Sequence, residues 1–167
     1  MKRIVVVVVL LMFLSVNAGA VGLITVEVRS DWTLWDIAQD FNLDVERLMQ
    51  INDLEDTTIH PGQKLKVEGY DNSTVTVSWY GEEFHGDAMS NGQVFDMEDK
   101  TVAAHKWLPF GTKVRLTRID TNRSIIVMIQ DRGPYVEGRN FDLSKGAARK
   151  LNMLGEGVVE CTATILS

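Results

Sequence analysis

The stretch SIIVMIQDRGPY, residues 124–135, joins a hydrophobic run to an acid, a base, a glycine and a proline. The run to Ile129 predicts a buried strand, and Gly133-Pro134 predicts the turn that ends it. Asp131 is therefore expected at a strand end, a position where proteins often hold reactive side chains. Asp is also a common turn former, so these residues alone leave two interpretations open: a turn residue or a reactive carboxyl group.

The composition is that of a globular protein. The chain has 167 residues, 45% of them hydrophobic, which is enough to bury a core in one domain or two small ones. The formal net charge is -6, and no basic patch favours nucleic acid as a partner. A single cysteine, Cys161, excludes an intrachain disulfide framework. We expect a monomer.

Residues 1–20 have the pattern of an export signal. Lys2-Arg3 is a positive start, residues 4–16 are an apolar run, and Ala18-Gly19-Ala20 offers the small residues that a signal peptidase reads. The run is shorter than the roughly 20 apolar residues of a spanning helix, so an uncleaved anchor is the second interpretation. We predict cleavage after Ala20, export to the periplasm or cell wall, and no membrane insertion of the mature chain.

Residues 24–67 predict a module with the order strand, helix, helix, strand. Thr33 and Asp36 have the spacing of a capping box, which starts the first helix. A second short helix is expected after Asp44, and residues 64–67 are expected to form the closing strand. Four apolar residues at helical spacing share one face of the first helix: Leu34, Ile37, Ala38 and Phe41.

This module resembles a LysM domain, the peptidoglycan- and chitin-binding module of about this length. The matching positions run through the whole segment: Asp31, Thr33-Leu34, Ile37-Ala38, Leu48, Asn52, Leu54, Ile59 and Pro61-Gly62-Gln63-Lys64-Leu65. The resemblance implies binding of an N-acetylglucosamine backbone in a shallow groove between the loops 30–33 and 54–59. It places Asp31 and Thr33 among the glycan-binding residues.

A polar, glycine-containing stretch, residues 68–73, predicts the linker to a second module. The linker is short, so we expect the two modules to lie close together with some freedom of rotation.

Residues 74–167 predict a compact barrel of short strands with one small helix. Val75, Val77 and Trp79 alternate with polar residues, the pattern of a half-buried strand. Ser144 is expected to cap the helix, and Cys161 is expected to be a small core residue. Further strands are predicted at residues 113–119, 124–129 and 158–166.

Here the chain resembles the double-psi β-barrel of the rare lipoprotein A family, which is related to expansins and family 45 glycosidases. The matches are dense and ordered: Ser78-Trp79-Tyr80-Gly81, Phe84-His85-Gly86, Asn91-Gly92, Phe95-Asp96, Ala103-Ala104-His105, Leu108-Pro109-Phe110-Gly111-Thr112, Asp131-Arg132-Gly133-Pro134-Tyr135, Arg139 and Phe141-Asp142-Leu143-Ser144. The expected fold class is therefore α+β, with a small βααβ LysM domain joined to a six-stranded double-psi β-barrel.

The resemblance implies a lytic transglycosylase, which cleaves the bond between N-acetylmuramic acid and N-acetylglucosamine without water and leaves a 1,6-anhydro ring. Asp131 matches the family's acid, and His105 matches a site histidine that orients Asp131 or a substrate hydroxyl. The alternative for His105 is a packed structural histidine. Six further residues are expected to bind the sugar: Gln93, Tyr80, Glu83, Phe84, Asn91 and Arg132.

One departure from the family pattern concerns Gln93, where active members carry a glutamate. An amide can donate and accept hydrogen bonds but cannot transfer a proton. Either Gln93 only binds sugar and Asp131 suffices, or Glu82 or Glu83 supplies the second carboxylate. A non-catalytic, expansin-like protein that binds or loosens the wall is the alternative function. The three histidines do not fall at ligand spacing, so neither a metal nor another cofactor is expected.

Overall fold

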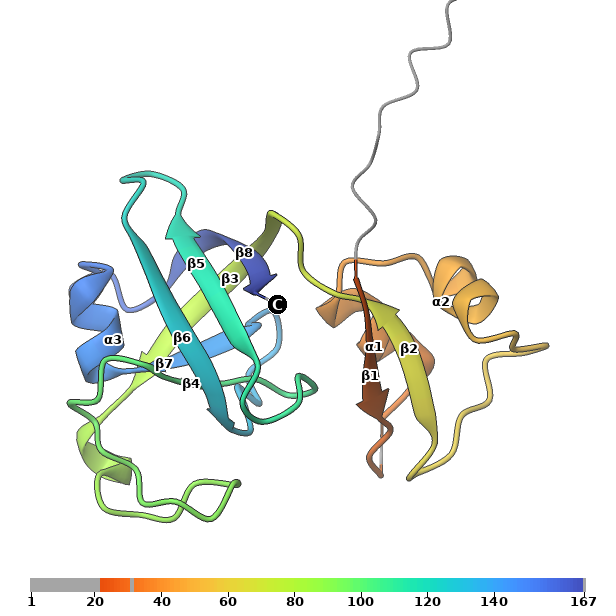
Figure 1. The fold of residues 1–167 in the computed structure, drawn as a ribbon, viewed down its shortest axis with the longest axis horizontal. Coiled ribbons are helices and arrows are strands. Elements are labelled where there is room, and N and C mark those ends of the chain that lie inside the picture. Colours follow the sequence, from red (N-terminus) through yellow and green to blue (C-terminus); the bar gives the residue numbers. More distant parts are fainter. Residues whose placement is uncertain (1–21, 31, 167) are drawn as a thin grey trace, which may run out of the picture.

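The computed structural model describes residues 22–30 and 32–166, which form two modules side by side, joined by one short segment (Figure 1). The predicted export signal, residues 1–20, and the predicted glycan contact Asp31 lie outside the described residues. Within the described part of the chain, no helix is both long and apolar enough to cross a membrane.

The first module has the predicted order of elements. Its strands β1 (Leu23–Glu27) and β2 (Lys64–Glu68) pair antiparallel, and the helices α1 (Leu34–Asp40) and α2 (Val45–Ile51) lie between them in the chain. Thr33 caps α1 in a complete capping box with Asp36. The predicted apolar face is confirmed, since all four of its members are buried: Leu34, Ile37, Ala38 and Phe41.

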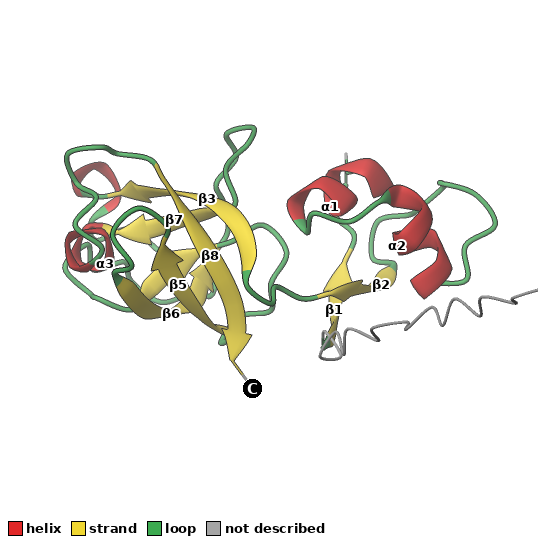
Figure 2. Ribbon diagram, turned by 90° about the horizontal axis from the view of Figure 1, so that it is seen from above, coloured by secondary structure: helices red, strands yellow, loops and turns green. Residues whose placement is uncertain are grey.

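The second module is a closed barrel of strands (Figure 2). The strand order is β3-β7-β4-β6-β5-β8, which confirms the six-stranded barrel and the α+β class. The predicted strands correspond to β3 (Ser73–Tyr80), β5 (Lys113–Arg118), β6 (Ser124–Asp131) and β8 (Val159–Leu166). Ser144 caps α3 (Lys145–Lys150) by accepting from the Ala147 N–H. Cys161 is fully buried, as predicted, and burial raises the pKa of its thiol to about 12.

Two short strands complete the barrel, β4 (Val102–Ala104) and β7 (Phe141–Ser144). Strand β4 pairs parallel with β6, and β7 pairs parallel with β3, while β4 and β7 pair antiparallel with each other. In this register Ala104 lies opposite Asp131 on one side and Asp142 on the other. The barrel thus aligns two carboxylic acids on strands that flank β4.

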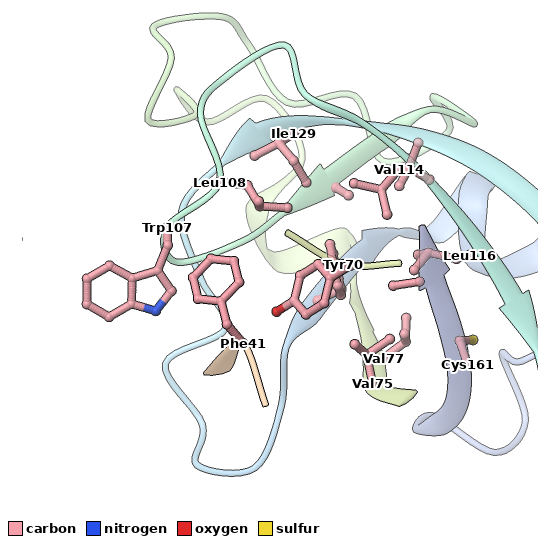
Figure 3. Close-up of a cluster of buried hydrophobic side chains, with 14 of the residues drawn as sticks. Phe41, Tyr70, Val75, Val77, Trp107, Leu108, Val114, Leu116, Ile129 and Cys161 are labelled. Carbon is pink, nitrogen blue, oxygen red and sulfur yellow. The ribbon is translucent and has the colours of Figure 1, made fainter. Parts of the chain in front are cut away.

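The apolar cores of the two modules are continuous. Tyr70, from the predicted linker, is 3% exposed and stacks on Phe41 of the first module with ring centroids 5.3 Å apart. The same ring lies 5.6 Å from Phe141 in the barrel. Figure 3 shows Tyr70 and Phe41 in one cluster with barrel residues such as Val77. This arrangement favours a fixed junction over the expected freedom of rotation, because a buried aromatic side chain joins the two cores.

Polar contacts at Asp40, the last residue of α1, reinforce the junction. Its carboxylate accepts from Lys106 Nζ at 2.9 Å and from Trp107 Nε1 at 2.6 Å. Its backbone oxygen accepts from Tyr70 Oη at 2.5 Å and from Asn140 Nδ2 at 3.3 Å. The side chains of Asp40 and Lys106 are 12% and 16% exposed. Deleting one partner would leave the other as a largely buried charge without a counter-ion, which would lower the free energy of unfolding by about 3–5 kcal/mol. By contrast, the pair Arg149–Glu98 is exposed to solvent, which screens its charges, so it is expected to contribute little to stability.

Candidate functional site

Asp131 ends β6 at the rim of the barrel, where Gly133 turns the chain with φ 138°. Three donors lie 2.8 Å from its Oδ1 atom: Ser90 N–H, Ser90 Oγ and the N–H of Arg132. Its Oδ2 atom faces the hydroxyl of Tyr80 at 3.5 Å. The carboxyl group is half-buried and held at one oxygen, which leaves Oδ2 as the atom available for proton transfer.

Tyr80 forms the floor beside this carboxyl group. Its ring stacks on Phe95 with centroids 4.3 Å apart and meets the exposed ring of Phe84 edge-on at 5.8 Å. Burial, followed by the charges of Asp131 and Asp142, raises the pKa of the Tyr80 phenol far above its usual range. The hydroxyl therefore stays protonated and serves as a donor. The two predicted sugar-binding aromatics Tyr80 and Phe84 thus lie together next to Asp131.

Asp142 is a second carboxyl group at this end of the barrel. It lies in β7, is half-buried, and accepts a short hydrogen bond from Ser78 Oγ. Burial raises the pKa of Asp142, and the Ser78 hydrogen bond offsets only part of that effect. Two strand spacings separate it from Asp131, roughly 10 Å between backbones. The sequence places Asp142 within a family motif but does not predict its position beside Asp131, because that position depends on the register of β4 and β7.

Gln93 and Asn91 lie on the same loop as Ser90, the residue that holds Asp131. Asn91 Nδ2 donates to Gln93 Oε1 at 3.2 Å, and the Gln93 N–H donates to Asn91 Oδ1 at 2.9 Å. The Met89 N–H donates to the Gln93 backbone oxygen at 2.7 Å and closes the turn. Gln93 is exposed, so this loop presents amide groups to solvent while Ser90 fixes the acid.

The two glutamates considered as replacements for the missing carboxylate lie in the short 3-10 helix Glu82–Phe84. Glu82 is bound to Lys145 Nζ at 2.5 Å, and this ion pair lowers its pKa. Glu83 is exposed to solvent. Asp142, half-buried and with a raised pKa, has more of the properties of a second acid than either glutamate does.

The side chain of His105 points away from Asp131 and into the junction between the modules. It is 1% exposed, and Tyr70 Oη lies 3.0 Å from its Nε2 atom. Its Nδ1 atom accepts from the N–H groups of Trp107 and Leu108, which places the proton on Nε2. Its link to Asp131 is through the backbone, since the His105 N–H donates to the Asp131 backbone oxygen at 3.2 Å.

Arg132 connects the His105 loop to the site. Its Nη1 atom donates to the backbone oxygens of His105 at 3.2 Å and Leu108 at 2.9 Å. Its guanidinium group also lies 3.8 Å above the ring of Phe110. The buried imidazole of His105 accepts hydrogen bonds from two backbone N–H groups of the loop 105–110. Arg132, which follows Asp131 directly, holds the same loop through two of its backbone oxygens. His105 and Arg132 are therefore connected to Asp131 through backbone groups.

In the first module, the predicted glycan contact Thr33 is exposed, and its side chain is engaged in the cap of α1 with Asp36. The neighbouring Trp32 packs edge-on against Trp107 of the barrel. Trp32 thus brings the entry to α1 into contact with the second module. The structure does not bring Thr33 together with the residues around Asp131.

The geometry defines a class of protein: a closed barrel with paired carboxylic acids and exposed aromatic rings at one end, docked to a small βααβ module. Family models match both parts. One described as lytic transglycolase matches residues 72–163, and one described as LysM domain matches residues 26–68. The chain belongs to the lytic transglycosylase family and carries a LysM domain.

Three relatives share this barrel sequence. A probable endolytic peptidoglycan transglycosylase RlpA of Treponema pallidum is 46% identical over 97 residues, which cover 58% of this chain and 28% of that protein. A probable enzyme of the same name from Aquifex aeolicus is 45% identical over 89 residues, 53% of this chain and 39% of the relative. The endolytic peptidoglycan transglycosylase RlpA of Helicobacter pylori is 38% identical over 122 residues, 69% of this chain and 38% of the relative. The chain thus spans less than half the length of these relatives.

The buried His105 predicts a pH dependence of stability. Burial, with smaller effects from Lys106 and Arg132, holds the pKa of His105 well below its usual value. In the unfolded chain the imidazole titrates near pH 6.5. The free energy of unfolding is therefore highest above that pH and decreases as the pH falls towards the pKa of His105 in the folded protein. We expect the free energy of unfolding in urea to be about 1.4 kcal/mol lower at pH 5.5 than at pH 7.5. The variant His105→Gln should be less stable but should lose most of this difference; an unchanged difference would contradict the assignment.

Proposed function

We propose that this protein is an exported endolytic lytic transglycosylase that cleaves the glycan strands of peptidoglycan in the periplasm or cell wall. The observation that carries the proposal is the state of Asp131: Oδ1 is held by three donors, and Oδ2 is left beside the Tyr80 hydroxyl. A carboxyl group fixed at one oxygen, with the other directed to a rim lined by aromatic rings, suits proton transfer to a sugar.

The reaction requires two proton transfers. A carboxylic acid protonates the glycosidic oxygen as its bond to C1 of N-acetylmuramic acid breaks. A carboxylate then takes the proton from the 6-hydroxyl group, whose oxygen bonds to C1 and closes the 1,6-anhydro ring. Asp131 Oδ2 is the proposed site of both transfers, and the Tyr80 hydroxyl is the donor that steadies this oxygen.

Asp142 is the proposed second carboxyl group. Its burial and raised pKa favour the neutral form, which assists both transfers at Asp131 by donating a hydrogen bond to the reacting sugar. In this proposal Gln93 and Asn91 bind sugar hydroxyls through their amides. The presence of glutamine instead of the family's glutamate at position 93 therefore leaves the proton transfers intact. The non-catalytic, expansin-like alternative is favoured by Gln93 alone.

The first module is proposed to hold the enzyme on its polymeric substrate. The names of the relatives, endolytic peptidoglycan transglycosylases, and the LysM match support a glycan strand as the common ligand of both modules. The docked junction supports one fixed orientation of the LysM domain relative to Asp131.

The first test removes the acid. Wild type incubated with purified sacculi, both intact and stripped of peptides, should release fragments with 1,6-anhydro ends, detected by mass spectrometry. Asp131→Asn retains the shape and the Oδ1 acceptor but cannot transfer a proton, so release should fall at least about 10²-fold. The exposed Asp71→Asn is the matched control and should cleave like wild type. Wild type that binds stripped glycan but yields no anhydro ends would establish the non-catalytic alternative.

A second test decides which residue supplies the other carboxyl group. Asp142→Asn keeps the acceptor for Ser78 Oγ, so the barrel should fold, while the rate of anhydro-end release should fall about 10²-fold. Gln93→Glu should change the rate by less than about tenfold, since Asp142 already provides the group. The opposite pattern, a large gain from Gln93→Glu and no loss from Asp142→Asn, would assign the missing function to position 93.

A further inference from the structure

A cavity of about 470 Å³ lies between the two modules. Helix α1 and its entry loop supply one wall, with Trp32, Trp35 and Gln39, and the barrel loop after Asp131 supplies the other, with Tyr135, Val136 and Glu137. We infer that this cavity is a sugar-binding site formed jointly by the two modules, in which Trp35 and Tyr135 contact a glycan strand. It is separate from the groove between loops 30–33 and 54–59 that the LysM resemblance implies.

The walls have the chemistry of a carbohydrate site. Trp35 is 60% exposed and Tyr135 is 68% exposed, although large aromatic side chains are usually covered. Tyr135 is positioned from the first module, since Arg29 Nη1 lies 3.4 Å from its hydroxyl. Rings offer flat apolar faces to the C–H groups of a pyranose, and the exposed amide of Gln39 offers hydrogen bonds to its hydroxyl and acetamido groups.

The charges of the cavity favour a neutral sugar over an anionic peptide. Its acidic residues are Asp36, Asp40 and Glu137, and its one base, Lys106, is bound to Asp40 at 2.9 Å. The wall is therefore net negative and would repel carboxylates. An N-acetylglucosamine unit carries no charge, whereas N-acetylmuramic acid freed of its peptide carries a lactyl carboxylate, so the cavity favours the N-acetylglucosamine units of a strand. Its volume falls within the usual range for small-ligand sites, roughly 300–1,000 Å³.

The cavity is joined to the proposed catalytic groups by a single segment of chain. Residues 132–140 run from Asp131 at the end of β6 to β7, which contains Asp142, and this segment forms the barrel wall of the cavity. Asn140 anchors its far end, because its side chain binds the Thr76 N–H at 2.9 Å and the Asp40 backbone oxygen at 3.3 Å. A glycan strand bound to Tyr135 is thus bound to the loop that links Asp131 to Asp142. The inference rests on the proposed function only for the identity of the glycan as peptidoglycan.

The test measures binding without cleavage. The full chain carrying Asp131→Asn is titrated with N-acetylglucosamine tetramer, with peptide-free glycan strands and with a free anionic peptide, and heat of binding and tryptophan fluorescence are recorded. Trp35→Ala and Tyr135→Ala should each weaken binding of the neutral N-acetylglucosamine tetramer about tenfold or more. Trp35→Phe should retain most of the affinity while losing most of the fluorescence change. Ile126→Ala, which removes an exposed apolar side chain on β6 outside this cavity, is the matched control and should bind as the parent does.

The outcomes separate this inference from the proposed function. Glycan binding that is unchanged in both alanine variants overturns the cavity as a sugar site and assigns the binding to the LysM groove. Preferential binding of a free anionic peptide over the tetramer also overturns it. If wild type fails to cleave sacculi while the two variants still lose binding, the proposed function fails and the cavity stands. If wild type cleaves and the variants bind normally, the cavity fails alone.

Discussion

The structure depends on the way in which Asp40 ends helix α1. The last carbonyl groups of a helix lack partners within the helix, and here the Asp40 oxygen is satisfied by Tyr70 and Asn140, from the linker and the barrel. Its carboxylate binds Lys106 and Trp107 of the barrel. One residue of the LysM domain thus meets donors from the linker and from two barrel loops. These polar contacts surround a continuous apolar core, so separating the modules would expose both the core and a buried charge.

This junction also positions the two loops that are connected to Asp131. The loop shaped by His105 and the loop 132–140 both contact the first module, and both are tied to the acid, the first through Arg132 and the second by continuity of the chain. His105, for which the sequence left open a role at the substrate and a packed structural role, is buried between aromatic rings: Phe41, Tyr70 and Phe141. The histidine therefore holds the modules and the loop in place, while the carboxyl groups and aromatic rings face the solvent side of the barrel rim.

Local sequence patterns predict the elements that have one buried face, but they do not predict the short strands or the contacts between the modules. Helical spacing from Leu34 to Phe41 and alternation in the longer strands identify elements that have one buried face. Strands β4 and β7 are three and four residues long and mostly buried on both sides, so they carry no alternation. Tyr70 lies in a polar stretch that has the composition of a linker, and only the tertiary contacts show that it belongs to the core. The proposal of Asp131 as the acid comes from its motif, whereas the proposal of Asp142 depends on register across three strands.

The central claim is that the two modules form one body, with the LysM domain fixed relative to Asp131. Backbone N–H residual dipolar couplings in a weakly aligned sample test it most directly, because each module reports its own alignment tensor. The structure predicts that couplings from residues 22–69 and from residues 73–166 fit a single tensor with the present arrangement of the modules. Two tensors that differ in magnitude or orientation would show independent motion and would contradict the claim.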